Sequence, residues 1–186
     1  TISGIKITDN SLAFAGLFGY VRDAYSLPKI KNLTMSGKVD IVNSNVYNQH
    51  SGLLVGELWG VVENCHTSAE DTNLVSVKTV YNGYTRTAIG GLVGWLAGSE
   101  ARDGMVGSSF NGTVYGENTV SGTGHNSGAY VGGIVGVTNR TNVKNCVINA
   151  DVTGNTYRYL ALGGAIGYNM GEFSEHSGNS FTGNLS

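Results

Sequence analysis

Short apolar segments rich in glycine recur along the chain, and each is followed further on by residues that alternate between apolar and polar. The clearest copy is Ile89-Gly90-Gly91-Leu92-Val93-Gly94, which four close variants accompany. Recurrence at spacings of a few tens of residues is typical of repeat proteins. The pattern therefore predicts an array of five repeats with loops of variable length. The final glycines of the five copies, 31 to 42 residues apart, are Gly19, Gly56, Gly94, Gly136 and Gly167.

A second pattern follows each glycine motif: an aliphatic residue, a spacer, Asn or Ser, and then a small or apolar residue. An alternating segment that ends in a turn former comes next, as in Asn111-Gly112-Thr113-Val114-Tyr115-Gly116. Alternation with period two predicts a half-buried strand. Each repeat therefore offers three short strands, namely the glycine motif, the Asn motif and the alternating segment. The Asn motif occurs at 30–33, 62–65, 106–109, 143–146 and, in a weaker form, 177–180.

Three strands and three corners per repeat predict one coil of a parallel β-helix, or solenoid. We therefore expect an all-β fold of about five coils, in which each coil buries its apolar face against its neighbours. A β-sandwich also contains many short strands, but a fixed repeat favours the solenoid. Extra residues at roughly 40–50, 70–87 and 117–129 are expected to stack along one edge. The predicted repeats within this single domain are about 14–50, 51–87, 88–128, 129–160 and 161–186.

The glycine core, the aliphatic-x-Asn-Cys segment and the Asn-Gly-Thr-Val or Ala-Asp-Val-Thr-Gly tail together resemble the GLUG motif. The resemblance covers nearly the whole chain, although Ala15, Phe18 and Ala165 depart from the pattern in the first and last copies. GLUG repeats occur in large bacterial surface proteins, including adhesin-like proteins and the non-catalytic regions of some IgA-specific metallopeptidases. The resemblance implies an extracellular, right-handed β-helical region of a cell-surface or secreted protein. It does not imply one activity.

Composition agrees with strands and narrows the function classes. Glycine accounts for 29 of 186 residues, and charged residues make up 13% against a usual value of about 25%. The small net charge of −2 and the lack of a basic stretch argue against a nucleic-acid partner. No apolar run is long enough to predict a membrane span in this fragment. Because the chain starts at Thr1, without Met or a signal peptide, we expect it to be part of a longer protein, whose remainder would be a partner.

The asparagines of the second motif, Asn32, Asn64 and Asn145, are expected to form a structural ladder at one corner, continued by Ser108 and Asn179. Asn tolerates left-handed backbone and can bond to the next Asn along a stack. We expect this ladder to be buried and to have no binding role.

Cys65 and Cys146 occupy the same slot two repeats apart. Two steps of parallel strands separate them by roughly 9–10 Å, which exceeds the reach of a disulfide. The sequence therefore predicts two free, buried thiols that act as small apolar core residues.

No set of residues predicts catalysis, a metal or a cofactor. The four histidines, His50, His66, His125 and His176, show no metal-ligand spacing. A phosphate-binding role for the glycine pairs would need a following helix and a Lys, which are missing after Gly94. Close approach of another backbone is the better explanation of the glycine pairs.

Aromatic residues are the candidates for ligand binding. Tyr20, Trp95 and Tyr168 directly follow the glycine motif, and Trp59 lies shortly after Gly56. If these rings face outward, they form a broken stripe that could stack on sugars or on protein partners. Alternatively, they cap the core at a corner. A second candidate surface is the edge that carries the loop tyrosines, which are Tyr47, Tyr81, Tyr84, Tyr130, Tyr157 and Tyr159.

These features predict a non-catalytic structural and adhesive module that meets a host surface protein or a glycan through its loops or aromatic edge. One alternative is a dedicated glycan-binding module. Another is a fragment of a β-helical polysaccharide-degrading enzyme, which should place charged residues at outward positions of neighbouring repeats. Charged residues do not recur in this way, so we expect no enzyme.

Overall fold

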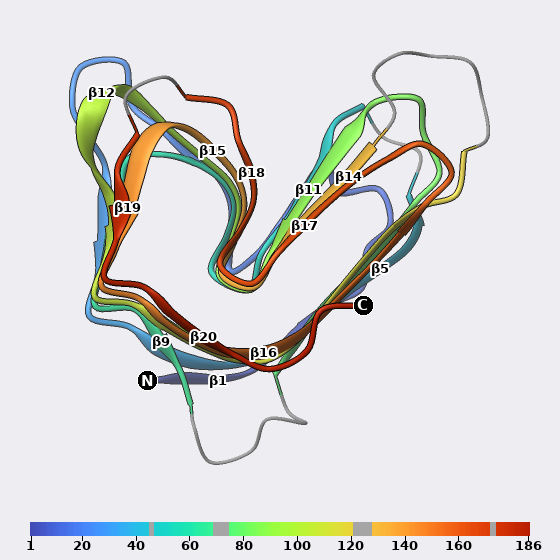
Figure 1. The fold of residues 1–186 in the computed structure, drawn as a ribbon, viewed down its shortest axis with the longest axis horizontal. Coiled ribbons are helices and arrows are strands. Elements are labelled where there is room, and N and C mark those ends of the chain that lie inside the picture. The colour runs from blue at the N-terminus through green and yellow to red at the C-terminus, as the bar shows by residue number, and fades with distance from the viewer. Residues whose placement is uncertain (45–46, 69–74, 121–127, 172–173) are drawn as a thin grey trace.

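Strands are the only regular elements of the described chain, as its Val, Ile, Thr and Tyr content favours. The computed structural model describes residues 1–44, 47–68, 75–120, 128–171 and 174–186 (Figure 1). Within these ranges there are twenty β-strands, and no helix that could cross a membrane. Every strand pairing is parallel. The prediction of an all-β fold with parallel strands is confirmed.

The strands form three sheets, of which sheet A contains the alternating segments. Its order is β1 (Ile2–Ile7), β5 (Thr34–Ser44), β10 (Ser76–Tyr81), β13 (Ser109–Asn118), β16 (Val147–Thr156) and β20 (Ser180–Thr182), with β9 (His66–Thr67) beside β5 and β13. Buried positions alternate with more exposed positions along β13 and β16, as the sequence pattern predicts.

Sheets B and C lie on either side of the glycine motifs. Sheet B has the order β17 (Tyr159–Gly163), β14 (Gly128–Gly132), β11 (Arg86–Gly90), β6 (Gln49–Ser51) and β2 (Phe14–Ala15). Sheet C has the order β18 (Ile166–Asn169), β15 (Val135–Lys144), β12 (Val93–Val106), β7 (Val55–Trp59) and β3 (Phe18–Arg22). Three short strands extend sheet C, namely β4 (Lys29–Lys31), β8 (Val61–Glu63) and β19 (His176–Ser177).

The chain passes through the sheets in the same order each time, from B to C to A and back to B. Thus β11 is followed by β12 and β13, and β14 by β15 and β16. Each strand pairs with its equivalent in the neighbouring repeat, as Val93 does with Val55 and Val135. Successive repeats therefore overlie one another in Figure 1.

Apolar side chains from all three sheets fill the enclosed space. In sheet A, Val39, Val77, Val114 and Val152 form one column and are at most 1% exposed. Each fully buried side chain of this kind contributes about 1.5–3 kcal/mol to stability. Several apolar residues of the outermost strands are only partly buried, among them Ile5, Val21 and Ile166. Stacking against neighbours on both sides is therefore what completes the core.

The glycine motif is not a single strand, which corrects the sequence prediction. In the third repeat, β11 ends at Gly90 in sheet B and β12 begins at Val93 in sheet C. The motif is the sharp bend between two sheets, so its apolar residues belong to both. A Cβ at Gly90 would lie 2.1 Å from the Val93 carbonyl oxygen and 2.6 Å from the Gly136 nitrogen. Only glycine permits backbones to approach so closely.

The extra residues of the repeats do not all lie along one edge, which also corrects the prediction. Residues 69–74 lie outside the described residues, but the flanking strands β9 and β10 both pair with β5 and β13. The predicted insertion 70–87 therefore interrupts sheet A and then includes β10 and the start of β11. A parallel neighbour on each side allows the strand to resume in register after the interruption. Residues 45–46 and 121–127, also outside the described residues, instead come between sheets A and B in the chain.

Strand register shifts two residues of the predicted asparagine ladder. Met105 pairs with Val62, so Gly107 stands beside Asn64 and Ser108 stands beside Cys65. Ser108 and Asn179 thus belong to the cysteine column, where their side chains accept hydrogen bonds from the backbone nitrogens of Cys65 and Cys146. Left-handed backbone defines the ladder column, which contains Asn32 (φ 56°), Asn64 (φ 51°), Gly107 (φ 60°), Asn145 (φ 53°) and Gly178 (φ 67°).

The asparagines of this column are exposed, so the expectation of a buried ladder is wrong. Asn64 Nδ2 donates a long hydrogen bond of 3.4 Å to Asn32 Oδ1. The corner turns outward there, which places the Asn side chains in solvent. The prediction for the cysteines is confirmed, because Cys65 and Cys146 are free and fully buried.

Candidate ligand-binding pocket between sheets B and C

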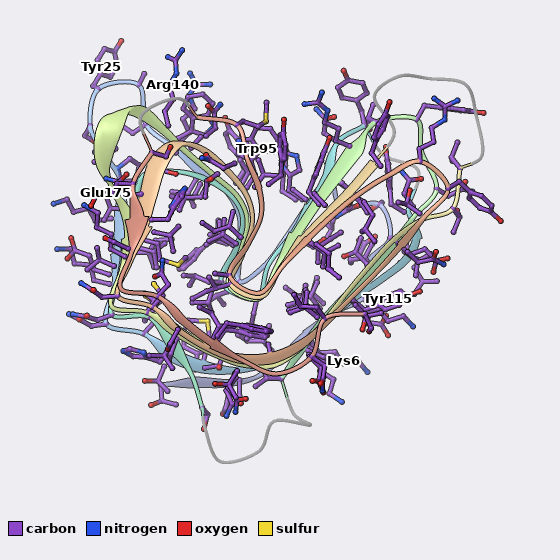
Figure 2. All side chains as sticks on the ribbon, in the orientation of Figure 1. Lys6, Tyr25, Trp95, Tyr115, Arg140 and Glu175 are labelled. Carbon is purple, nitrogen blue, oxygen red and sulfur yellow. The ribbon has the colours of Figure 1, made fainter. Side chains whose placement is uncertain are left out.

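The bend at each glycine motif brings the outward faces of sheets B and C toward one another (Figure 1). On sheet C, strand pairing aligns Tyr20, Glu57, Trp95, Val137 and Tyr168 in one column, as the sequence predicts. Tyr20 and Tyr168 are 47% and 41% exposed, and Trp95 is partly exposed. This column faces the space between the two sheets, where Figure 2 shows Trp95.

Sheet B supplies a second column opposite the first, which sequence reasoning missed. Strand pairing aligns Phe14, His50, Ala88, Tyr130 and Ala161. Each of these residues stands two positions before a glycine of the motif. That fixed spacing is the signal that could have found the column. The sequence pattern predicts one strand at each glycine motif. It therefore does not predict a second sheet opposite the column that runs from Tyr20 to Tyr168.

Rings of the two columns contact each other across the space between the sheets. The ring centroids of His50 and Trp95 are 5.0 Å apart and stacked, and those of Tyr130 and Tyr168 are 4.9 Å apart and stacked. At the other end, Phe14 and Tyr20 lie 5.2 Å apart. We call these six side chains the aromatic seam. Such contacts contribute roughly 0.5–1.5 kcal/mol each beyond area burial, and they hold the two sheets at a fixed separation.

A charged cluster lies at the second repeat of the seam. His50 Nδ1 is 2.8 Å from Glu57 Oε2, and Trp59 Nε1 donates a 2.8 Å hydrogen bond to Glu57 Oε1. The Arg22 guanidinium lies over the Trp59 ring, 4.4 Å from its centroid. Both carboxylate oxygens of Glu57 are therefore engaged.

The pKa of Glu57 reflects this cluster. Burial has the largest single influence and raises the pKa. The hydrogen bonds with His50 and Trp59, together with the weaker Coulombic influence of His50 and Arg22, outweigh burial and bring the pKa below its ordinary value of 4.5. Glu57 is thus ionised at neutral pH and acts as a fixed anchor for both neighbouring rings.

A pocket with a volume of about 340 Å³ opens beside this cluster. We call it the B–C pocket. His50, Glu57, Trp59 and Trp95 form one part of its lining, and Thr85 and Arg86 form another, together with Tyr47 and Asn48 from the segment before β6.

Arg86 contributes positive charge to the B–C pocket. Its guanidinium carbon lies 5.9 Å from the Tyr130 ring centroid. Among the described residues it forms no ion pair with a carboxylate.

Two of the predicted binding residues, Trp59 and Trp95, line the B–C pocket, whereas Tyr20 and Tyr168 lie elsewhere along sheet C. Trp59 also lines a second hollow of about 290 Å³ that it shares with Arg22 and Tyr25.

The loop tyrosines do not form one surface. Tyr81 is 1% exposed, so its assignment to an exposed edge is wrong, and its hydroxyl is hydrogen-bonded to Thr85 Oγ1. Tyr130 lies in the seam, and Tyr47, Tyr84, Tyr157 and Tyr159 are exposed.

The lining of the B–C pocket contains aromatic, amide, hydroxyl and charged side chains. Glu57 is the one carboxylate among its lining residues, whereas most glycoside hydrolases use two. No group of three or more His, Cys, Asp or Glu within the described ranges could hold a metal ion. His125 lies outside the described residues.

Comparisons of this chain with protein-family models, with curated proteins and with solved structures found no match.

Proposed function

We propose that this chain is a non-catalytic binding section of a bacterial cell-surface or secreted protein, and that it binds saccharides in the B–C pocket. The observation that carries the proposal is the pair of tryptophans in that pocket. Trp95 is stacked on His50, and Trp59 donates a hydrogen bond to Glu57. Both indole rings are therefore held in place before a ligand binds. Rings held rigid in this way bind sugar faces at little entropic cost.

The scaffold in this proposal is a β-solenoid of five coils, and the resemblance to GLUG repeats leads us to expect a right-handed one. The equivalent pairing of strands in neighbouring repeats supports it, as does the constant order of sheets. A stiff stack of parallel strands would serve as a spacer that displays the pocket away from the cell. Adhesion to host or matrix glycans is the role that fits both a stiff spacer and a saccharide-binding pocket.

The enzyme alternative has less support. A polysaccharide-degrading site would need a second carboxylate near Glu57, and the other lining residues of the B–C pocket are neutral or basic. Both oxygens of Glu57 are already held by His50 and Trp59. A general acid or base must instead reach the substrate directly.

Binding of the whole chain to an array of bacterial and host glycans tests the proposal. We expect binding to a subset of glycans, with a loss of about tenfold in affinity for Trp95→Ala, because a stacked ring contributes about 0.5–1.5 kcal/mol beyond the burial of its apolar area. Tyr157→Ala is the matched control, since that ring is 73% exposed and does not line the pocket. Absence of glycan binding, or equal loss in both variants, would overturn the proposal.

A further inference from the structure

We infer that the B–C pocket selects acidic saccharides, with the sugar ring on Trp95 and the sugar carboxylate on Arg86. This inference rests on the proposed function and adds the chemical class of the ligand. The class covers uronic acids and nonulosonic acids, which share a pyranose ring and a carboxylate. Three features of the pocket support it: its charge, its stacking platform and its fixed polar segment.

Charge is the first feature. Arg22 and Arg86 both lie near the pocket, while its one carboxylate, Glu57, is already held by His50 and Trp59. Arg86 forms no ion pair within the described part of the chain, and its contact is with the face of Tyr130. A guanidinium is suited to a ligand carboxylate because its planar donors can form two parallel hydrogen bonds. A cationic ligand would instead meet uncompensated positive charge.

The stacking platform is the second feature. Trp95 is partly exposed and lines the pocket, and the stacked His50 ring supports it at 5.0 Å. His50 is itself only 5% exposed, so it cannot swing away without opening the seam. The apolar face of a pyranose can pack on such an indole. A pocket of about 340 Å³ is at the small end for ligand sites, which suits the terminal sugar of a chain.

The fixed polar segment is the third feature. The Asn48 backbone nitrogen donates a 3.1 Å hydrogen bond to Thr85 Oγ1, which is also bonded to the buried hydroxyl of Tyr81. Asn48 has a left-handed backbone with φ of 54°. These contacts join the segment before β6 to the start of β11, next to Arg86. Polar groups that are fixed before binding lose less entropy when they meet sugar hydroxyls.

Calorimetric titration of the whole chain with two matched disaccharides tests the inference. One ends in glucuronic acid and the other in glucose, so they differ only in the carboxylate. We expect the acidic sugar to bind about tenfold more tightly at low salt, as a charge-assisted hydrogen bond provides, and less tightly as salt is added. Arg86→Gln should remove the preference and retain binding of the neutral sugar. Trp95→Ala should weaken both.

The possible outcomes distinguish selectivity for acidic saccharides from saccharide binding itself. Equal binding of the two sugars by the native chain, with loss of both in Trp95→Ala, would overturn the acidic selectivity and leave saccharide binding in place. Binding of neither sugar, together with an array on which no glycan binds, would overturn the proposed function itself. Arg86→Lys keeps the positive charge but loses the paired donors of the guanidinium. We expect this variant to retain part of the preference for the acidic sugar. Thermal unfolding of each variant checks that it is folded.

Discussion

Left-handed backbone is the property that the residues of the asparagine column share, and it admits Gly as well as Asn. Asn64 and Asn145 have φ of 51° and 53°, and Gly107 in the same column has φ of 60°. Asn and Gly are the residues that adopt this conformation at little cost. An alignment by Asn or Ser therefore placed Ser108 in the wrong column, whereas an alignment by Asn or Gly would have placed Gly107 correctly.

The two thiols provide a prediction at the scale of single residues. Burial raises the pKa of the Cys65 thiol and raises the pKa of Cys146 to about 11, both from an ordinary 9.0. Because the thiolate is the reactive form, we expect iodoacetamide to label neither residue in the native chain. Both should be labelled in urea, as read by mass spectrometry. Val147→Cys supplies an exposed thiol as a positive control, since Val147 is 56% exposed. Rapid native labelling of Cys65 or Cys146 would contradict the assigned burial.

Glu57 provides a second residue-scale prediction, which concerns pH. Because the pKa of Glu57 lies below 4.5 in the folded chain, its stabilising contribution is fully present above that value. It is lost as the pH falls through the lowered pKa. We expect Glu57→Gln to lower the free energy of unfolding at about pH 7 by on the order of 1 kcal/mol, since hydrogen bonds to a charged acceptor are lost. The difference from the native chain, measured by urea denaturation at several pH values, should shrink as the pH falls below 4.5 and through the lowered pKa. A difference that stays constant with pH would rule out the ionised cluster.

At the scale of elements, glycine decides how sheets B and C meet. The glycines that follow the bend lie against the sheet B strand of the preceding repeat. A Cβ at Gly94 would lie 2.5 Å from the Ser51 nitrogen, and one at Gly167 would lie 2.6 Å from the Val131 nitrogen. Gly19 belongs to the first repeat, where the nearest atom to such a Cβ is the Phe14 carbonyl oxygen of the same repeat, at 3.2 Å. At Gly94 and Gly167, the closest backbone-to-backbone contacts therefore form between neighbouring repeats.

This difference predicts unequal effects of one substitution at two equivalent positions. Gly94→Ala should lower the free energy of unfolding by about 2 kcal/mol or more, because the added methyl meets backbone that cannot move aside. Gly19→Ala, its matched control, should change stability by less than about 1 kcal/mol. Neither glycine has a left-handed backbone, so strain does not confuse the comparison. Urea denaturation measures both, and equal losses would contradict the packing between repeats.

At the scale of the whole molecule, the sequence predicted what periodicity determines and missed what backbone bending determines. The repeat spacing, the parallel strands, the cysteine slot and the column from Tyr20 to Tyr168 follow from regular recurrence, and strand pairing agrees with them. The bend at Gly90 was missed because an apolar strand and a bend with apolar flanks have the same pattern. Without that bend, His50 and Tyr130 could not be placed opposite Trp95 and Tyr168. The half of the candidate site that sheet B supplies was therefore not predicted.

The position of a residue in the stack should determine what its side chain contributes to stability. Leu92, at the bend of the third repeat, is fully buried between neighbours on both sides, whereas Leu162, on the last strand of sheet B, is only partly buried. Leu92→Ala should lower the free energy of unfolding by about 2–5 kcal/mol, because it leaves a cavity that its surroundings cannot close. Leu162→Ala should cost less than about 2 kcal/mol, since solvent already reaches that site.

Denaturant unfolding of both leucine variants, followed by circular dichroism, provides the comparison. The two substitutions remove the same atoms, so the difference between them reports how completely each leucine is surrounded. In a stack held together by contacts between adjacent repeats, a central loss weakens two interfaces and a terminal loss weakens one. A chain whose stability came from within each repeat would instead lose similar amounts at Leu92 and Leu162. That result would remove the physical basis for the solenoid, because it would show that the repeats do not depend on one another.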